Sequence, residues 1–332
     1  MEILVNNYPV DFVIENEKTV SEVVDSILVW CRQKDLILTM IYIDDEIFAL
    51  DQIPDRSVDS VKIINCLIQS RSELVFASVD EGIRYCEKAD LFVKDASISG
   101  RVGRSDMVDL ASGLIWLDDI VSNIIHLLGL KADTVKFRDI NLSEYISSLE
   151  SYKNSIENGS VDTYLDILKS NAGIFLTSIG ILRMLIVSDE MKALVMQSID
   201  SPDVLMKSLL QIKDSLGEQL DNIESTAAAF QAGKDAEGIE GFKKFIDFIA
   251  EYVRTSSQVA PVFDINLSEI KINDTSLEEK NRVLQDFLNQ TVEIMENNDI
   301  ISLSDMLEYE IKPSLGDLGD YIDIIQSRIQ GR

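Results

Sequence analysis

The spacing of apolar residues changes once along this chain, near residue 70. Before that point apolar and polar residues alternate in short runs, the period of two that is typical of β-strands. From about residue 72 onward apolar residues recur at intervals of three and four, as on one face of an α-helix. This change predicts an α+β chain, with a small strand-containing domain followed by an all-helical region.

The charge balance limits the partners of such a chain. Its 332 residues include 30 Lys plus Arg against 58 Asp plus Glu, a formal net charge of -28. Because basic side chains supply most of the affinity for phosphate, we expect no nucleic acid and no anionic membrane as partner, whereas a basic protein is permitted. Hydrophobic residues make up 46% of the chain, too many for an acidic disordered protein, so folded domains are expected.

Three separated cysteines, Cys31, Cys66 and Cys86, form no CxxC pair, and the first residues lack the basic and apolar regions of a signal peptide. Both features favour a reducing, cytoplasmic location. The longest apolar run, residues 174–187, contains Arg183 and is shorter than the roughly 20 residues that span a bilayer. We therefore expect no membrane-spanning helix.

Residues 1–70 combine a predicted hairpin, a helix and further strands. Asn6 and Asn7 form a two-residue turn between alternating runs, the second of which continues through Ile14. Thr19 and Glu22 have capping-box spacing and predict a helix over residues 19–33. Further strands are expected at 37–43, 47–48 and 61–68.

This order of elements, with the opening MEILVNNYPVDFVI, resembles the β-grasp fold of ubiquitin-like and sulfur-carrier proteins. The resemblance covers residues 1–70 and implies a docking module. Those proteins are activated at a free C-terminal Gly-Gly, whereas here the chain continues from Gln69 into a predicted helix, so activation is not expected. A small sheet that only caps the helical part is the structural alternative. The remainder resembles an uncharacterised bacterial helical protein.

The helical remainder contains an internal similarity that predicts two repeat units, 71–200 and 201–332. Residues 110–124 align with 239–253 at an offset of 129, and the hexamer DINLSE occurs at both 139–144 and 264–269, an offset of 125. Residues from 157 align with those from 296 at an offset of 139, as far as Gly180 and Gly319. Two copies are too few for a solenoid, so a pair of helical bundles is expected. The alternative is the general similarity of amphipathic helices.

The sequence predicts no catalytic residue, no cofactor site and no metal site. The single histidine, His126, lies beside apolar residues and has no HExxH or cysteine cluster near it. No G-x-S-x-G nucleophile motif is present, and paired carboxylates are common in so acidic a chain. The basic, glycine-rich residues 100–104 do not match a phosphate-binding loop and are expected to form a turn between helices.

One segment stands out as a candidate partner contact. Tyr309 lies between Glu308 and Glu310, and Pro313 is expected to kink or end the helix that carries them. Such a tyrosine could contact an arginine-rich partner, or it could pack between helices of the bundle.

Together these features predict a non-enzymatic, cytoplasmic protein-interaction scaffold, adaptor or chaperone, whose partner is a basic or amphipathic protein. The first alternative is a structural subunit of a homo-oligomeric assembly. The second is a small-ligand sensor or enzyme with a site between the two helical units.

Overall fold

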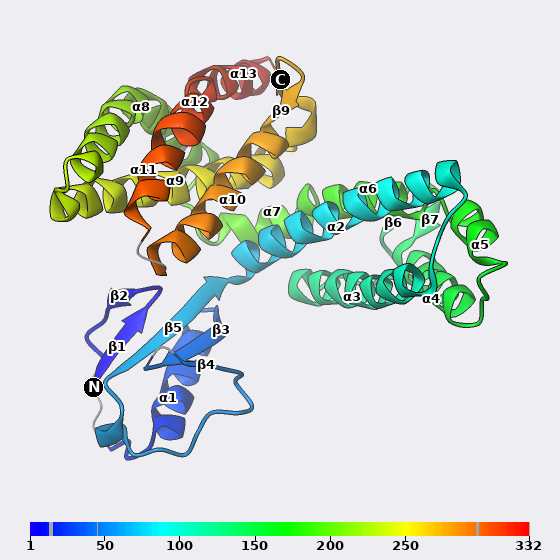
Figure 1. The fold of residues 1–332 in the computed structure, drawn as a ribbon, viewed down its shortest axis with the longest axis horizontal. Coiled ribbons are helices and arrows are strands. Elements are labelled where there is room, and N and C mark those ends of the chain that lie inside the picture. The colour runs from blue at the N-terminus through cyan, green and yellow to red at the C-terminus, as the bar shows by residue number, and fades with distance from the viewer. Residues whose placement is uncertain (13–15, 45, 297–298, 332) are drawn as a thin grey trace. The chain divides into compact units, whose positions relative to one another are not determined.

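The chain forms two compact units in the computed structural model, Met1–Ala77 and Ser78–Arg332 (Figure 1). The structure describes residues 1–12, 16–44, 46–296 and 299–331. The first unit contains a mixed β-sheet and the second is almost entirely helical, which confirms the predicted α+β class. The predicted repeat 201–332 lies within the second unit, and so does the repeat 71–200 except for its first seven residues, because helix α2 (Arg71–Ser99) begins in the first unit and continues into the second.

The first unit is a five-stranded sheet with one helix, α1 (Val20–Gln33), consistent with a small β-grasp-like fold. The strand order is β2-β1-β5-β3-β4, and the parallel pair β1 and β5 lies inside the sheet. Apolar side chains from α1 and one face of the sheet form the core of this unit. The elements are β1 (Glu2–Val5), β2 (Tyr8–Pro9), β3 (Leu36–Ile43), β4 (Glu46–Phe48), the 3-10 helix η1 (Val58–Ser60) and β5 (Ile63–Ser70).

Local sequence determines the first two features of this unit. Asn6 and Asn7 both have positive φ, 52° and 69°, as a tight hairpin turn requires. Thr19 accepts a hydrogen bond from the Glu22 backbone, and the Glu22 carboxylate accepts one from the Thr19 backbone, so the predicted capping box begins α1. The second strand ends at Pro9: Val10 and Phe12, predicted to continue it, are not in a strand, and Ile14 lies outside the described residues.

The second unit contains two successive sets of helices, which we call the first half (residues 78–200) and the second half (residues 201–332). The first half comprises α2, α3 (Arg104–Leu128), β6 (Lys136–Phe137), β7 (Ile140–Asn141), α4 (Leu142–Glu157), α5 (Tyr164–Ser170), α6 (Ile174–Ile186) and α7 (Asp189–Met196). The second half comprises α8 (Pro202–Gln231), α9 (Asp235–Phe263), the 3-10 helix η2 (Leu267–Glu269), β8 (Lys271–Ile272), β9 (Thr275–Ser276), α10 (Leu277–Glu296), α11 (Ile300–Met306), the π-helix η3 (Leu307–Ile311), α12 (Lys312–Leu315) and α13 (Leu318–Gln330).

The two halves present their elements in a similar order. Each begins with a pair of long helices joined by a tight turn, and the glycine after the first helix has positive φ in both cases, 65° at Gly100 and 70° at Gly233. The second long helix ends in a left-handed residue in both, Gly129 after α3 and Asp264 after α9. These endings place corresponding residues 133 apart at the first turn and 135 apart after the second helix.

A two-stranded hairpin follows the second long helix in each half, which the prediction of an all-helical region missed. The Leu142 amide donates to the Val135 carbonyl at 3.0 Å, and the Leu277 amide donates to the Ile270 carbonyl at 2.8 Å. Both leucines begin a helix with an N-terminal cap, Asn141 with Glu144 before α4 and Ser276 with Glu279 before α10. Each of these pairs is again separated by 135 residues.

The structure corrects the alignment that the repeated DINLSE hexamer suggested. Residues 139–144 cover the end of the first hairpin and the first turn of α4, whereas residues 264–269 follow α9 and form η2 before the second hairpin. The asparagine of each hexamer caps the turn that follows it, Asn141 in α4 and Asn266 in η2. The shared letters therefore reflect the same local capping chemistry at places that do not correspond.

The predicted offset of 129 between α3 and α9 is also wrong by two residues. It paired Trp116, which is 37% exposed, with the fully buried Phe245. An offset of 131 pairs Phe245 with the buried Leu114 and pairs Met107 with Gly238, which is also buried. Apolar residues recur every three or four positions along both helices, so a two-residue shift still matches many of them.

The offset between corresponding residues of the two halves changes along the chain, mostly by about one helical turn at a time. The offset increases by four residues within α9 and again by four within α10, and four residues add about one helical turn. A further single residue is added at η3, since the buried Leu168 corresponds to Leu307 at 139 whereas the buried Phe175 corresponds to Leu315 at 140. Buried faces are thereby preserved on both sides of each change.

The stretch Tyr164–Ile186 is long and apolar enough to cross a membrane by length and composition alone, and 33% of it is buried inside the structure. A turn at residues 171–173 divides it into α5 and α6. The buried side chains of α6, among them Phe175 and Leu182, belong to the core of the first half. Core helices pass the same composition test, so this stretch is weak evidence of a membrane span.

Candidate functional site

The predicted partner contacts lie on a π-helical turn, η3, between α11 and α12 (Figure 1). The Lys312 amide donates to the Leu307 carbonyl five residues earlier, which is the wide hydrogen bond of a π-turn. Pro313 follows, and its ring has no N–H to give to the preceding turn. Of the two expected effects of Pro313, a kink or an end of the helix, the end does not occur: the helical backbone passes through Pro313 and ends at Leu315.

The solvent side of α11 and η3 combines apolar and acidic side chains. Tyr309 is 69% exposed and Ile301 is 76% exposed. Asp305, Glu308 and Glu310 are also exposed. Residues 301, 305, 308 and 309 fall near one line along a helix, two turns in length. We call Ile301, Asp305, Glu308, Tyr309 and Glu310 the α11–η3 face.

The opposite side of these helices is anchored on α8. Leu303, Leu307 and Ile311 are buried, and polar contacts flank them. The Gln231 amide donates to the Glu308 carboxylate at 3.1 Å, and Lys312 forms an ion pair with Glu224. Because η3 is packed and bonded on one side, Tyr309 is presented from a fixed backbone.

The charge of the α11–η3 face is negative. Asp305, Glu308 and Glu310 lie within six residues, and the nearby cation Lys312 is engaged by Glu224 of α8. An exposed tyrosine and isoleucine flanked by carboxylates provide apolar contact area together with acceptors for basic donors. This combination suits a basic or amphipathic protein surface.

The prediction identified Glu308, Tyr309 and Glu310 but missed Ile301 and Asp305. The structure leaves all five exposed along the α11–η3 segment, while the Glu308 carboxylate also contacts Gln231 at the end of α8. Helical spacing from Tyr309 back to Ile301 was the available signal. It was hidden because the sequence around Pro313 predicted a broken helix.

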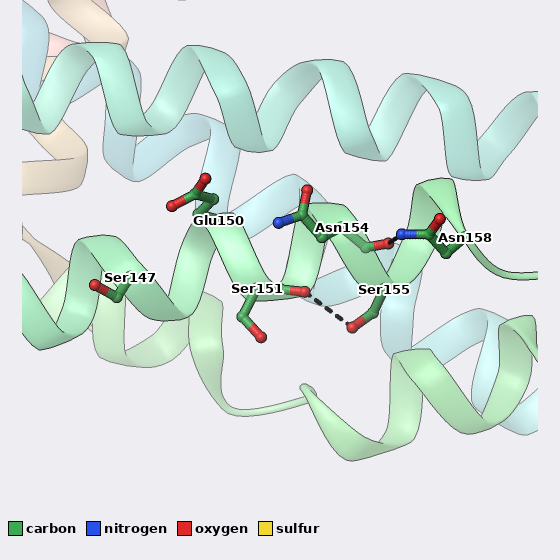
Figure 2. A pocket seen from close by; sticks show the side chains of 6 residues that line it. All are labelled: Ser147, Glu150, Ser151, Asn154, Ser155 and Asn158. Carbon is green, nitrogen blue, oxygen red and sulfur yellow. Dashed lines mark hydrogen bonds between the residues drawn. The ribbon is translucent and has the colours of Figure 1, made fainter.

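A shallow polar groove on α4 is a second candidate. Figure 2 shows six polar side chains that line it, all from α4 and the residue that follows this helix: Ser147, Glu150, Ser151, Asn154, Ser155 and Asn158. Several are occupied locally, since Ser155 donates to the Ser151 carbonyl at 2.9 Å and Asn158 to the Asn154 carbonyl at 2.8 Å. One helix supplies the entire lining, so no polar groups converge on a ligand from different directions.

Acidic residues lie beside this groove. Burial raises the pKa of Asp118 in α3, and the nearby carboxylates of Asp119 and Glu150 add to the increase. Within the described part of the chain, no group of three His, Cys, Asp or Glu side chains is arranged to hold a metal ion. His126, considered above for such chemistry, is exposed near the end of α3.

A third candidate is a set of polar groups inside the first half. The Tyr145 hydroxyl donates to the Ser178 hydroxyl at 2.7 Å. Burial raises the pKa of Cys86 to about 12 and also raises the pKa of Tyr145 above its usual value. A thiol and a phenol in this state remain protonated at neutral pH, so neither is an activated nucleophile. The arrangement is that of a hydrogen-bonded core.

The basic residues 100–104 form the turn between α2 and α3. Gly100 takes a positive φ and α3 begins at Arg104. The segment follows a helix rather than a strand, which is the setting of an interhelical turn and differs from that of a phosphate-binding loop.

Two family descriptions match parts of this chain. Residues 1–70 match the family described as TP0873 N-terminal domain. Residues 205–320 match the family described as Domain of unknown function (DUF8042). The first match covers the sheet of the first unit, and the second runs from α8 into α13 and includes the α11–η3 face. No curated protein and no solved structure matches the chain.

Proposed function

We propose that this chain is a non-enzymatic, cytoplasmic interaction protein, a scaffold, adaptor or chaperone, that docks a basic or amphipathic protein on the α11–η3 face. The observation that carries this proposal is the presentation of Tyr309, 69% exposed, between two exposed carboxylates on a π-turn anchored to α8. π-turns within helices occur frequently at functional sites. Tyrosine is also among the residues that most often dominate the energy of a protein interface.

The apolar and the acidic side chains of this face would contribute to binding in different ways. Burial of Tyr309 and Ile301 beneath a partner would supply the apolar contribution, on the order of 1.5–3 kcal/mol for each fully covered side chain. The carboxylates of Asp305, Glu308 and Glu310 would select basic partners and accelerate encounter. Docking should therefore weaken with salt mainly through slower association.

The first unit supports the same class of function. Its five-stranded sheet and single helix are compatible with the ubiquitin-like resemblance, which implies a second docking module. The chain continues from Ser70 directly into α2, so activation at a terminal Gly-Gly has no place here.

We also propose that the two halves of Ser78–Arg332 arose by internal duplication. Matched turns, hairpins and capped helices at offsets of 131 to 139 support this proposal better than the identical hexamer does. The residues of the first half that correspond to Glu308–Glu310 at 139 are Lys169, Ser170 and Asn171. Docking through this face is therefore a property of the second half alone.

Capture from a lysate tests the proposal, with partners identified by mass spectrometry. The full chain is the bait, and the variant Glu308→Lys/Tyr309→Ala/Glu310→Lys should lose a basic partner that the wild type retains. The matched control is Asp162→Lys/Asp166→Lys at exposed positions around α5, which makes the same change in net charge at the corresponding place in the first half. Equal capture by all three chains, or turnover of a metabolite, would exclude the proposed function.

A further inference from the structure

An apolar pair on α2 has no cover in the first half. Leu91 is 60% exposed and Ile98 is 86% exposed. They are seven residues apart and therefore lie on one side of the helix, two turns from each other. Exposed large aliphatic side chains at this spacing are typical of a surface that meets a helix.

The surroundings of this pair are locally basic, although the chain as a whole is acidic. Residues 88–104 contain Lys88, Lys94, Arg101 and Arg104 against only Asp90 and Asp95, although the whole chain carries -28. Arg101 and Arg104 are exposed in the turn that follows Ile98. We call Leu91, Ile98, Arg101 and Arg104 the α2 surface.

The second half shows that a helix fits at the corresponding place. The glycines that follow α2 and α8, Gly100 and Gly233, relate Leu91 to Glu224 and Ile98 to Gln231. In α8 these two positions contact the chain's own η3 and α12, through the Glu224–Lys312 ion pair and the hydrogen bond from Gln231 to Glu308, although both side chains stay exposed. The corresponding positions in α2 carry apolar side chains that remain exposed.

The α2 surface is itself continuous with an established helix contact. Asp80 and Glu87, on the same side of α2 toward its start, are bound by Arg282 of α10 at 3.3 Å and 2.6 Å. Beyond Glu87 this side of α2 is exposed at Leu91 and Ile98. A further helix placed there would extend the row of contacts that α10 begins.

The chain also carries a segment of complementary chemistry. On the α11–η3 face, Ile301 and Tyr309 lie two turns apart with carboxylates between and beside them. Leu91 and Ile98 lie two turns apart with guanidinium groups beyond them. Apolar residues thus match apolar residues over a similar length, and Arg101 and Arg104 can meet Glu308 and Glu310, whereas the exposed Asp95 lies between the two apolar residues of α2.

We propose that the α2 surface of one copy of this chain binds the α11–η3 face of a second copy. This inference rests on the proposed function, because it names the occupant of that docking face. The two surfaces are different patches of one chain, so the contact is heterologous: each copy of a bound pair keeps one free patch, and the pair offers one of each kind. Repulsion between copies of net charge -28 is screened beyond about 8 Å at physiological ionic strength. The charges close to the contact therefore determine whether two copies attract or repel each other.

Sedimentation velocity on the full chain at physiological ionic strength tests this contact. The wild type should increase in weight-average mass as the protein concentration is raised, as mass action requires of a reversible association. Arg101→Glu/Arg104→Glu and Glu308→Lys/Glu310→Lys should each remain monomeric, with helical circular dichroism unchanged because all four positions are exposed. The control Asp162→Lys/Asp166→Lys should associate as the wild type does.

Mixing the two monomeric variants separates this contact from any other. One variant retains an intact α11–η3 face and the other an intact α2 surface, and the two reversed patches are also complementary in charge. An equimolar mixture should therefore regain the concentration-dependent increase in mass that each variant alone lacks. A wild type that stays monomeric, or α2 variants that associate normally, would overturn the inference. If a basic amphipathic peptide still bound the wild type but not Glu308→Lys/Glu310→Lys, the proposed function would stand while this inference failed. Absence of both peptide binding and self-association would reject both.

Discussion

The ammonium group of Lys280 lies 2.9 Å from the carboxylate of Asp317 and joins α10 to the start of α13. The two side chains are 11% and 32% exposed. In the first half the residue that corresponds to Lys280, 135 positions earlier, is Tyr145, whose hydroxyl donates to Ser178 of α6 at 2.7 Å. The same helix is thus attached by an ion pair in one half and by a neutral hydrogen bond in the other.

Removing one partner of the Lys280–Asp317 pair should destabilise the chain. Lys280→Met leaves the Asp317 carboxylate partly buried without its cation, and we expect a loss of about 2 kcal/mol, below the range for fully buried pairs because Asp317 is one third exposed. Urea unfolding followed by circular dichroism gives the value. Lys280→Met/Asp317→Leu should recover most of it, since an apolar pair avoids desolvation of either charge. Equal losses in the single and double variants would contradict this account.

Two helical glycines should respond to alanine with opposite signs. A Cβ at Gly113 in α3 would overlap the Tyr85 hydroxyl, whereas a Cβ at Gly217 in α8 meets nothing within 4 Å. We expect Gly217→Ala to stabilise the chain by up to about 1 kcal/mol through helix propensity. Gly113→Ala should lower the thermal midpoint because Tyr85 must move from its contacts with Trp116 and Phe175. Differential scanning calorimetry of the two variants distinguishes the signs, and stabilisation by both would contradict the packing of Tyr85.

The N-terminal cap of α10 should make the stability of the folded chain decrease at acidic pH. Hydrogen bonds from the Ser276 backbone and hydroxyl to the Glu279 carboxylate lower the pKa of Glu279 below the ordinary glutamate value of 4.5. A lowered folded pKa means that the stabilisation is complete above about pH 4.5 and is lost as pH falls through the lower value. Glu279→Gln should therefore be less stable than wild type at pH 7, and the difference should shrink below pH 4. Unfolding curves at both pH values measure this difference in stability between the variant and the wild type. Glu278→Gln is the matched control, because it makes the same substitution at a neighbouring glutamate whose partner is Arg183.

Arginines that join α2 to α10 should make the contact between the halves sensitive to salt. Arg282 bridges Asp80 and Glu87, and Arg84 pairs with both Asp80 and Asp286. Because these carboxylates are partly exposed, we expect a coupling energy of only about 0.5–1 kcal/mol between Arg282 and Glu87. A double-mutant cycle with Arg282→Met and Glu87→Gln gives this energy at low and high salt. Coupling that does not decrease with salt would show that the contact is better shielded than its exposure indicates.

Features set by neighbouring residues could be predicted from the sequence. The capping box of Thr19 and Glu22, the Asn6-Asn7 turn and the apolar face of α1 each depend on residues within a few positions of one another. The α+β class follows from the change of period near residue 70. The exposure of Tyr309 was one of two alternatives, and the packing of η3 against α8 decided it.

Features that depend on distant contacts could not be predicted in this way. The two-residue strands β6 to β9 are too short to give a period, although the positive φ at Asn273 and Asp274 occurs in a pair of turn-forming residues. The alignment of α3 with α9 depends on which side of each helix is buried. The spacing of apolar residues alone does not distinguish two offsets that differ by two residues. The identical hexamer misled because a short capping motif recurs wherever a helical turn begins.

The wide turn of η3 has an evolutionary consequence. A residue added inside an α-helix would rotate all following residues by about 100° around the helix axis. A π-turn instead accommodates the added residue within one wide turn of the backbone. Leu315 and Ile325 therefore keep the buried places that Phe175 and Leu185 occupy in the first half. Side chains around Tyr309 can thus be gained, lost or exchanged among descendants of this chain without altering its interior. On the proposed function, partner choice and folding would be selected separately at this position.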